Sequence, residues 1–175
     1  MSNACDYYYR MKETFFKDAM SQVPTNVGVV GSCEAESIRA CTISSLVSID
    51  VIDPTIIFVL KSESATLANI KSTKDFSINI LSGEQAHLSQ IYSNLRTENE
   101  NPDHTKYWEA YKTGVPIITN SHLSFVCVFT ASQELKNTTI VFAKVTEVIK
   151  SNSDNPLVYF DRKYFGLDGI NLESH

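Results

Sequence analysis

The sequence predicts a mainly β protein, an antiparallel β-barrel with a few peripheral helices. About seven segments have the alternating apolar pattern or β-branched composition of strands. Helical patterns are few, and most of the turns between the strands are short. A barrel is expected because closing an antiparallel sheet removes its exposed edges. With 175 residues, the whole chain, residues 1–175, is expected to form one domain with a sizeable core.

The N-terminal half is expected to begin with an amphipathic helix from Tyr8 to Gln22, because Met11, Phe15 and Ala19 recur at steps of four. Pro24 ends this helix, and turns are expected at residues 34–37 and at Asp53-Pro54. Strands are expected over residues 27–33, 42–48, 55–60 and 75–81, with a second helix over residues 64–72.

The C-terminal half is expected to contain a helix over residues 83–92, followed by a polar loop over residues 94–106. From residue 123 to residue 131 every second residue is apolar except for the small Ala131, as in a half-buried strand. Two more strands are expected over residues 140–149 and 157–160, and a loose tail over residues 166–175.

Composition excludes several classes of function. The formal net charge is −5, so a nucleic-acid partner is not expected, because no basic stripe is available to neutralise phosphates. No apolar run is long enough to span a bilayer, and no signal-peptide pattern is present. A cytoplasmic protein without a membrane partner is therefore expected.

The cysteine and histidine residues predict neither a metal site nor a disulfide framework. Four cysteines are scattered without a Cys-x-x-Cys pair, and four histidines lack ligand spacing. Cys41 and Cys127 fall within expected strands and are interpreted as small buried hydrophobic residues. No catalytic residue is predicted.

The first hydroxyl stretch, residues 42–48, carries Thr42, Ser44, Ser45 and Ser48 in an expected strand. Small hydroxyl residues fill a core poorly, but each offers a donor and an acceptor on a short stem. They would let a flat ligand approach the backbone while bonding to its rim. The alternative is that these hydroxyls simply face water.

The second hydroxyl stretch, residues 62–66, carries Ser62, Ser64 and Thr66 just where a helix is expected to begin. Ser64 is a suitable N-cap for that helix. A helix N-terminus offers free N–H groups and a positive dipole end, which together attract phosphate. The alternative is that Ser64 serves only as a cap.

Short motifs follow one another along the chain in a characteristic order. They are Pro24–Val27, Ala40–Ser48, Asp53–Thr55, Ser62–Thr66, Phe76–Leu81 and Pro156–Tyr164. In order and spacing they resemble the flavin reductase-like, FMN-binding family, the short NAD(P)H:flavin oxidoreductases of two-component monooxygenases. The resemblance covers about residues 15–164, which is taken as the core of the domain.

The resemblance implies an FMN-binding split β-barrel that forms a homodimer with the flavin near the subunit interface. It implies an NAD(P)H:flavin reductase that transfers hydride to FMN, with FAD or riboflavin as alternatives, and that supplies a flavin-dependent monooxygenase component. A second hypothesis is a non-enzymatic FMN-binding or flavin-storage protein. A third is a dimeric interaction domain that no longer binds flavin.

The resemblance also implies roles for individual residues. Thr25 and Val27 would line the flavin ring, and backbone N–H groups of residues 42–45 would bond its pyrimidine edge. Ser48 would contact the ribityl chain or remain structural, and residues 62–66 would hold the phosphate. The predicted cofactor-binding residues are Thr25, Val27, Thr42, Ile43, Ser44, Ser45, Ser48, Ser62, Ser64, Ala65 and Thr66. Trp108 and Tyr111 would either close over the ring or pack against the barrel.

The chain departs from the family pattern at several positions. Asn26 and Ala40 replace glycines, Leu46 replaces a phenylalanine, and Thr138 replaces a histidine associated with the pyridine nucleotide. Ala65 stands where many relatives carry a basic residue. FMN would then be held mostly by backbone and hydroxyl groups, and the weaker binding would suit a flavin used as a substrate.

Overall fold

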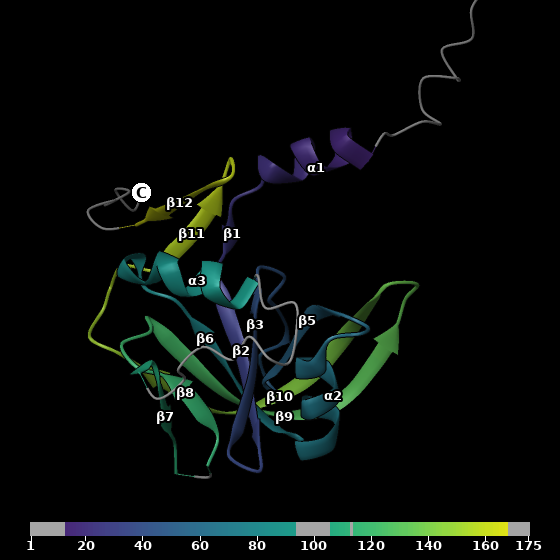
Figure 1. Cartoon of the computed structure of the whole chain (residues 1–175), viewed down its shortest axis with the longest axis vertical. Coiled ribbons are helices and arrows are strands. Elements are labelled where there is room, and N and C mark those ends of the chain that lie inside the picture. The colour runs from purple at the N-terminus through teal and green to yellow at the C-terminus, as the bar shows by residue number, and fades with distance from the viewer. Residues whose placement is uncertain (1–12, 94–105, 113, 168–175) are drawn as a thin grey trace, which may run out of the picture.

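A computed structural model describes residues 13–93, 106–112 and 114–167 (Figure 1). The helices are α1 (Glu13–Ser21), α2 (Ala65–Thr73) and α3 (Ala86–Ser93), with a 3-10 turn η2 (Gly83–Gln85) before α3. The strands are β1 (Thr25–Asn26), β2 (Gly28–Glu34), β3 (Ser37–Ile43), β4 (Val47–Asp50), β5 (Thr55–Lys61), β6 (Asp75–Ile80), β7 (Trp108–Ala110), β8 (Pro116–Ile118), β9 (Leu123–Glu134), β10 (Thr138–Lys150), β11 (Leu157–Phe160) and β12 (Lys163–Gly166).

The main sheet has seven antiparallel strands in the order β3-β2-β6-β9-β10-β5-β4. Its two edge strands, β3 and β4, are consecutive in the sequence, so the segment that joins them must bring one edge round to the other. The Val59 N–H on β5 donates to Ser45 Oγ in that segment, at 2.9 Å. The sheet therefore curls back on itself, and the mainly β barrel expected from the sequence is confirmed.

Two smaller sheets complete the fold. β1, β11 and β12 form one, and β7 and β8 form the other. In Figure 1, β11, β12 and α1 lie at one end of the molecule, beyond α3. α1 is held there by the Asp161 N–H, which donates to the Ser21 carbonyl at 2.7 Å, and by an ion pair between Arg162 and Asp18.

The core consists of two apolar clusters on opposite sides of β2 and β3. One fills the barrel beneath α2 and includes Phe58 and Phe76, whose ring centroids are 5.6 Å apart. The other lies beneath α3 and includes Tyr92 and Trp108. The indole Nε1 donates to the Tyr92 hydroxyl at 2.7 Å. Trp108 therefore packs against the barrel, and Gly31 is required beside it because a Cβ there would lie 2.4 Å from the ring.

Asn79 on β6 ties the sheet to its surroundings. This buried amide donates to the Val29 carbonyl and accepts from the Ile118 N–H and the Ser124 hydroxyl. The fold therefore satisfies this buried amide with hydrogen bonds to the protein itself, as is usual for buried polar groups.

Several boundaries differ from those expected. Residues 42–48 do not form one strand: β3 ends at Ile43 and β4 begins at Val47, because Ser45 turns toward β5. β12 occupies part of the region expected as a tail, and β1, β7 and β8 are additional short strands. The first third of the expected helix from Tyr8 and most of the polar loop over residues 94–106 lie outside the described residues.

Other expectations are confirmed. The turn at residues 34–37 is present, and both Ala35 and Glu36 have positive φ, as a tight hairpin turn requires. The second helix begins at Ala65 and the long hairpin β9–β10 turns at residues 135–137. Among the described residues, no helix is both long and apolar enough to cross a membrane.

Candidate functional site

The first hydroxyl stretch uses most of its buried hydroxyls to hold the protein together. Thr42 Oγ1 donates to the Ser89 carbonyl of α3 at 2.8 Å, and Ser45 accepts from β5. Ile43 is buried in the barrel core. The side chains of Ser44 and Ser48 are exposed. Ser44 and Ser48 are the exposed hydroxyl residues of this stretch, whereas Thr42 and Ser45 are half-buried.

The backbone of the first hydroxyl stretch has more hydrogen-bonding groups available to a ligand than its side chains have. β3 is an edge strand whose pairing partner in the sheet is β2. Alternate N–H and C=O groups of an edge strand point away from its single partner. The segment Ser44–Leu46 follows this edge without regular pairing of its own. A flat ligand placed along this edge would therefore be bonded by main-chain groups.

Thr25 lies on β1, and Val27 lies between β1 and β2. Thr25 pairs with Tyr159 of β11, and its side chain is half-buried. Val27 is 2% exposed and packs in the cluster beneath α3. Between them, the buried Oδ1 of Asn26 has no hydrogen-bond partner among the described residues. That oxygen is an acceptor for which the described fold supplies no donor.

The second hydroxyl stretch forms an uncapped helix N-terminus. Ser64 occupies the N-cap position with extended backbone angles, φ −68° and ψ 128°, but its side chain makes no capping bond to the described helix. The N–H groups of Ala65, Thr66 and Leu67 precede the first intrahelical bond, from the Ala68 N–H to the Ser64 carbonyl. These groups fit an anion, because no described side chain caps the positive end of α2.

Cys41 connects the two hydroxyl stretches. This residue lies on β3, and its thiol interacts with the side chains of Thr66 and Ser64. Burial raises the pKa of the Cys41 thiol, and the hydrogen bonds to Thr66 and Ser64 oppose that rise. The thiol therefore stays neutral near pH 7 and adds no negative charge beside the N-terminus of α2.

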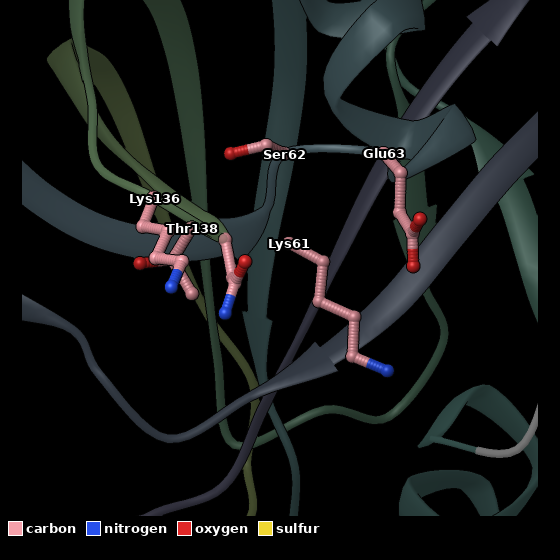
Figure 2. Close-up of a pocket in the computed structure, with 6 residues that line it drawn as sticks. Lys61, Ser62, Glu63, Lys136 and Thr138 are labelled. Atoms are coloured by element: carbon pink, nitrogen blue, oxygen red, sulfur yellow. The ribbon is translucent and has the colours of Figure 1, made fainter.

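A pocket of about 390 Å³ lies next to the second hydroxyl stretch, between the β5–α2 loop and the β9–β10 turn (Figure 2). The Ser62 N–H donates to the Asn137 carbonyl at 3.1 Å, and the Ser62 and Thr139 hydroxyls are 2.9 Å apart. These bonds place Ser62 beside Thr138, so the phosphate segment and the position of the family's histidine meet in one pocket. The lining residues are Lys61, Ser62, Glu63, Lys136, Asn137 and Thr138.

Five of those lining residues were not among the predicted site residues: Lys61, Glu63, Lys136, Asn137 and Thr138. The structure links the two segments through the β5–β10 pairing, which sets Thr138 opposite Lys61. Without that register, the turn after β9 has no visible relation to Ser62. The predicted roles of the site residues toward a flavin stay predictions, but the second hydroxyl stretch has the geometry they need.

Comparison with known proteins identifies the family. The model of the flavin reductase like domain matches residues 20–168. The chain belongs to this family. The match covers most of the chain, from the end of α1 to just past β12, and it confirms the resemblance carried by the ordered motifs.

Curated relatives and solved structures agree with this assignment. The flavin reductase-like chain is 24% identical over 157 residues to an FMN reductase (NADH) RutF of Acinetobacter baylyi, covering 90% of this chain and 83% of that protein. It is 25% identical over 156 residues to the RutF of Enterobacter cloacae, covering 89% and 94%.

The fold has close counterparts among solved structures. The styrene monooxygenase flavin reductase of Pseudomonas putida S12 superposes with a TM-score of 0.75 at 21% identity, covering 86% of this chain and 96% of that one. BorF, the flavin reductase component of a bacterial two-component tryptophan halogenase, gives 0.81 at 20% identity, covering 89% and 98%. These similarities confirm the split-barrel fold.

Proposed function

We propose that this flavin reductase-like protein is an NADH-dependent FMN reductase. The names of the curated relatives support both the FMN and the NADH. The observation in the structure that carries the proposal is the uncapped N-terminus of α2, where Ser64, Thr66 and free N–H groups converge. A terminal flavin phosphate is an anion of the kind that such a helix start binds.

The protein's part in the reaction is to bind and orient. A bound flavin accepts a hydride from a nicotinamide without an acid–base group from the protein, because the cofactors carry the chemistry. The outward backbone of β3 and residues 44–46 would hold the flavin's pyrimidine edge. Ser64, Thr66 and the first N–H groups of α2 would hold its phosphate. The two attachments together would fix the ring against the barrel for stacking.

A second candidate is a flavin-binding protein without reductase activity. Two observations favour it. Thr138 occupies the position of the family's histidine on the wall of the pocket. The buried Asn26 Oδ1, where the family has a glycine, has no hydrogen-bond partner within the described part of the chain. Thr138 would weaken nicotinamide docking and Asn26 would crowd the flavin edge, while both leave the phosphate site intact.

A homodimer is part of the proposal. None of the residues of α1 is buried by the described part of the chain. Its apolar side chains Phe15, Phe16 and Met20 are exposed, Phe15 to 66%. Such a face is stable in water only when something covers it. A second copy of the chain would do so, and sedimentation should then show a dimer that Phe16→Glu dissociates.

The proposed setting follows from the reaction. NADH and soluble flavin are available in the cytoplasm, and a flavin-dependent monooxygenase component would consume the reduced flavin. That partner would take reduced FMN by diffusion, so weak flavin binding would be an advantage.

The deciding experiment is NADH oxidation by the purified protein with and without added FMN, alongside a flavin fluorescence titration. We expect NADH oxidation that depends on added FMN. Saturable FMN binding without NADH oxidation would replace the proposal with the flavin-binding candidate. In that case Thr138→His and Asn26→Gly should restore turnover, because they return the two departures to the family pattern.

A further inference from the structure

The β9–β10 turn is fixed against the β5–α2 loop by pairing and by side-chain bonds. β10 pairs with β5 so that Thr138 is opposite Lys61 and Thr139 is opposite Leu60. The Ser62 N–H donates to the Asn137 carbonyl, and the Leu135 N–H donates to the Thr138 carbonyl. The backbone position of Lys136, between Leu135 and Asn137, is therefore set by main-chain bonds.

Lys136 brings a second cation to the pocket beside the second hydroxyl stretch. Figure 2 shows Lys136 and Thr138 on one side of the pocket and Lys61 and Glu63 on the other. Neither lysine takes part in an ion pair between described residues. The lining thus carries two lysines and one glutamate, a net positive charge to which Lys136 contributes from the β9–β10 turn.

The chemistry of the pocket suits a phosphate group. Its lining consists of ammonium, hydroxyl and amide groups with one carboxylate, and it contains no aromatic side chain on which a ring could stack. Ammonium groups and hydroxyls are the donors that bind phosphate oxygens. The N-terminus of α2 begins only three residues after Ser62. The lining reaches Glu63, the residue before the N-cap Ser64, so a phosphate at the start of α2 would lie next to this pocket.

We propose that Lys136 is a specificity-determining residue that selects flavins with a terminal 5′-phosphate over riboflavin. Many relatives carry a basic residue where this chain has Ala65, within the second hydroxyl stretch. Lys136 would supply that positive charge from the β9–β10 turn instead. The proposal rests on the proposed function, since it deepens the description of the same flavin site. The phosphates of a pyridine nucleotide would be bound by the same groups as the phosphate of a flavin. The test below distinguishes these two ligands.

The test compares flavin binding in wild type, Lys136→Met and Lys136→Arg by fluorescence titration with FMN and with riboflavin. Methionine keeps the length of the side chain and removes its charge. We expect Lys136→Met to raise the Kd for FMN about fivefold, to leave that for riboflavin unchanged, and to reduce the salt dependence of FMN binding. Lys136→Arg should bind FMN as wild type does.

Two further measurements complete the design. Lys163→Met, at an exposed lysine on β12, is the matched control and should leave the Kd for FMN unchanged. The KM for NADH, measured at saturating FMN, should be unchanged in Lys136→Met. A raised KM for NADH with an unchanged Kd for FMN would assign the pocket to the pyridine nucleotide and overturn the proposal.

The remaining outcomes separate this proposal from the proposed function. An equal loss of FMN and riboflavin binding, or no loss of either, would overturn the role of Lys136 while FMN-dependent NADH oxidation stood. Equal wild-type affinity for FMN and riboflavin would overturn it too, because the pocket would not recognise the phosphate. Wild type that binds neither flavin would overturn both proposals.

Discussion

The two hydroxyl stretches have similar compositions but are placed differently in the fold. In the first, Thr42 and Ser45 bond to backbone groups of α3 and β5. In the second, Ser64 stands at a helix start without capping it, and the following N–H groups precede the first helical bond. Hydroxyls bonded to neighbouring elements, that of Ser62 to Thr139 among them, are less available to a ligand. What distinguishes the second stretch is its helix start, whose N–H groups no described side chain caps.

This difference separates stability from binding. Changes in the buried hydroxyls of the first stretch should lower the free energy of unfolding and leave flavin affinity nearly unchanged. Changes in the second should lower flavin affinity and leave stability nearly unchanged. If both kinds of change affected both quantities, the comparison would fail. The substitutions below test it from the largest expected effect to the smallest.

The largest effect should come from Ser64→Ala combined with Thr66→Val. Both hydroxyls stand at the N-terminus of α2, and hydrogen bonds to a charged phosphate are stronger than neutral ones. We expect the Kd for FMN to rise about 10- to 100-fold, measured by fluorescence titration. Thr66→Val keeps the volume of a buried side chain and removes only its contact with the Cys41 thiol, which is a weak hydrogen-bonding partner. The free energy of unfolding should therefore change little.

A matched control lies at the other end of the same helix. Thr73 Oγ1 donates to the Asn69 carbonyl, so Thr73→Val makes the same chemical change away from the N-terminus. It should not alter the Kd for FMN. Tight FMN binding in the double variant would refute the phosphate site, and the backbone of the first stretch would then have to carry the affinity.

The next largest effect should come from Ser45→Ala. Its hydroxyl accepts the Val59 N–H where the sheet curls back on itself, and the substitution would leave that donor unsatisfied. We expect the free energy of unfolding to fall by about 1.5 kcal/mol, measured by urea denaturation. The Kd for FMN should change less than threefold, because the flavin is expected to use the backbone here.

Thr42→Val should have a smaller effect on stability. The substitution keeps the shape of the side chain and removes only the bond from Oγ1 to the Ser89 carbonyl of α3. We expect a loss of about 1 kcal/mol in the free energy of unfolding. A variant as stable as wild type but poor in FMN binding would show that the Thr42 hydroxyl serves the ligand after all.

Local patterns predicted much of the fold. Alternating apolar residues located β9, the turn at Ala35 and Glu36 followed from a polar cluster, and Ser64 marked the start of α2 within a residue. The single strand expected over residues 42–48 was wrong because a long-range bond from Ser45 to β5 breaks it. β1 and β12 are too short to show a period, and they exist through pairing with β11.

The part of the site whose residues are close together in the sequence could be predicted. The second hydroxyl stretch is a contiguous signal, and its position at a helix start follows from Ser64 and the helical pattern after it. Lys136 is different, because only the pairing of β5 with β10 brings its turn beside Ser62. Ser62 and its bonded partner Thr139 are 77 positions apart in the sequence. The hydrogen bond from the Thr42 hydroxyl to the Ser89 carbonyl of α3 also joins residues that are far apart in the sequence.

The smallest effect concerns Cys41, where the two stretches meet. Burial raises the pKa of this thiol above the ordinary value of 9.0, against the effect of its hydrogen bonds to Thr66 and Ser64. A raised pKa in the folded state means that the protonated thiol stabilises the fold. This contribution is complete below the unfolded pKa and is lost as pH rises through the folded pKa. Near neutral pH the free energy of unfolding should therefore not change with the pH through this group.

The difference in unfolding free energy between wild type and Cys41→Ala isolates this contribution. Between pH 7 and pH 9 it should shift against wild type by at most about 0.4 kcal/mol, since half of the unfolded thiols are ionised at their pKa. Cys127, whose pKa burial also raises, is common to both proteins and cancels. A shift in favour of wild type would mean that the thiolate is the stabilised form, and the N-terminus of α2 would then already attract a negative charge from its own chain.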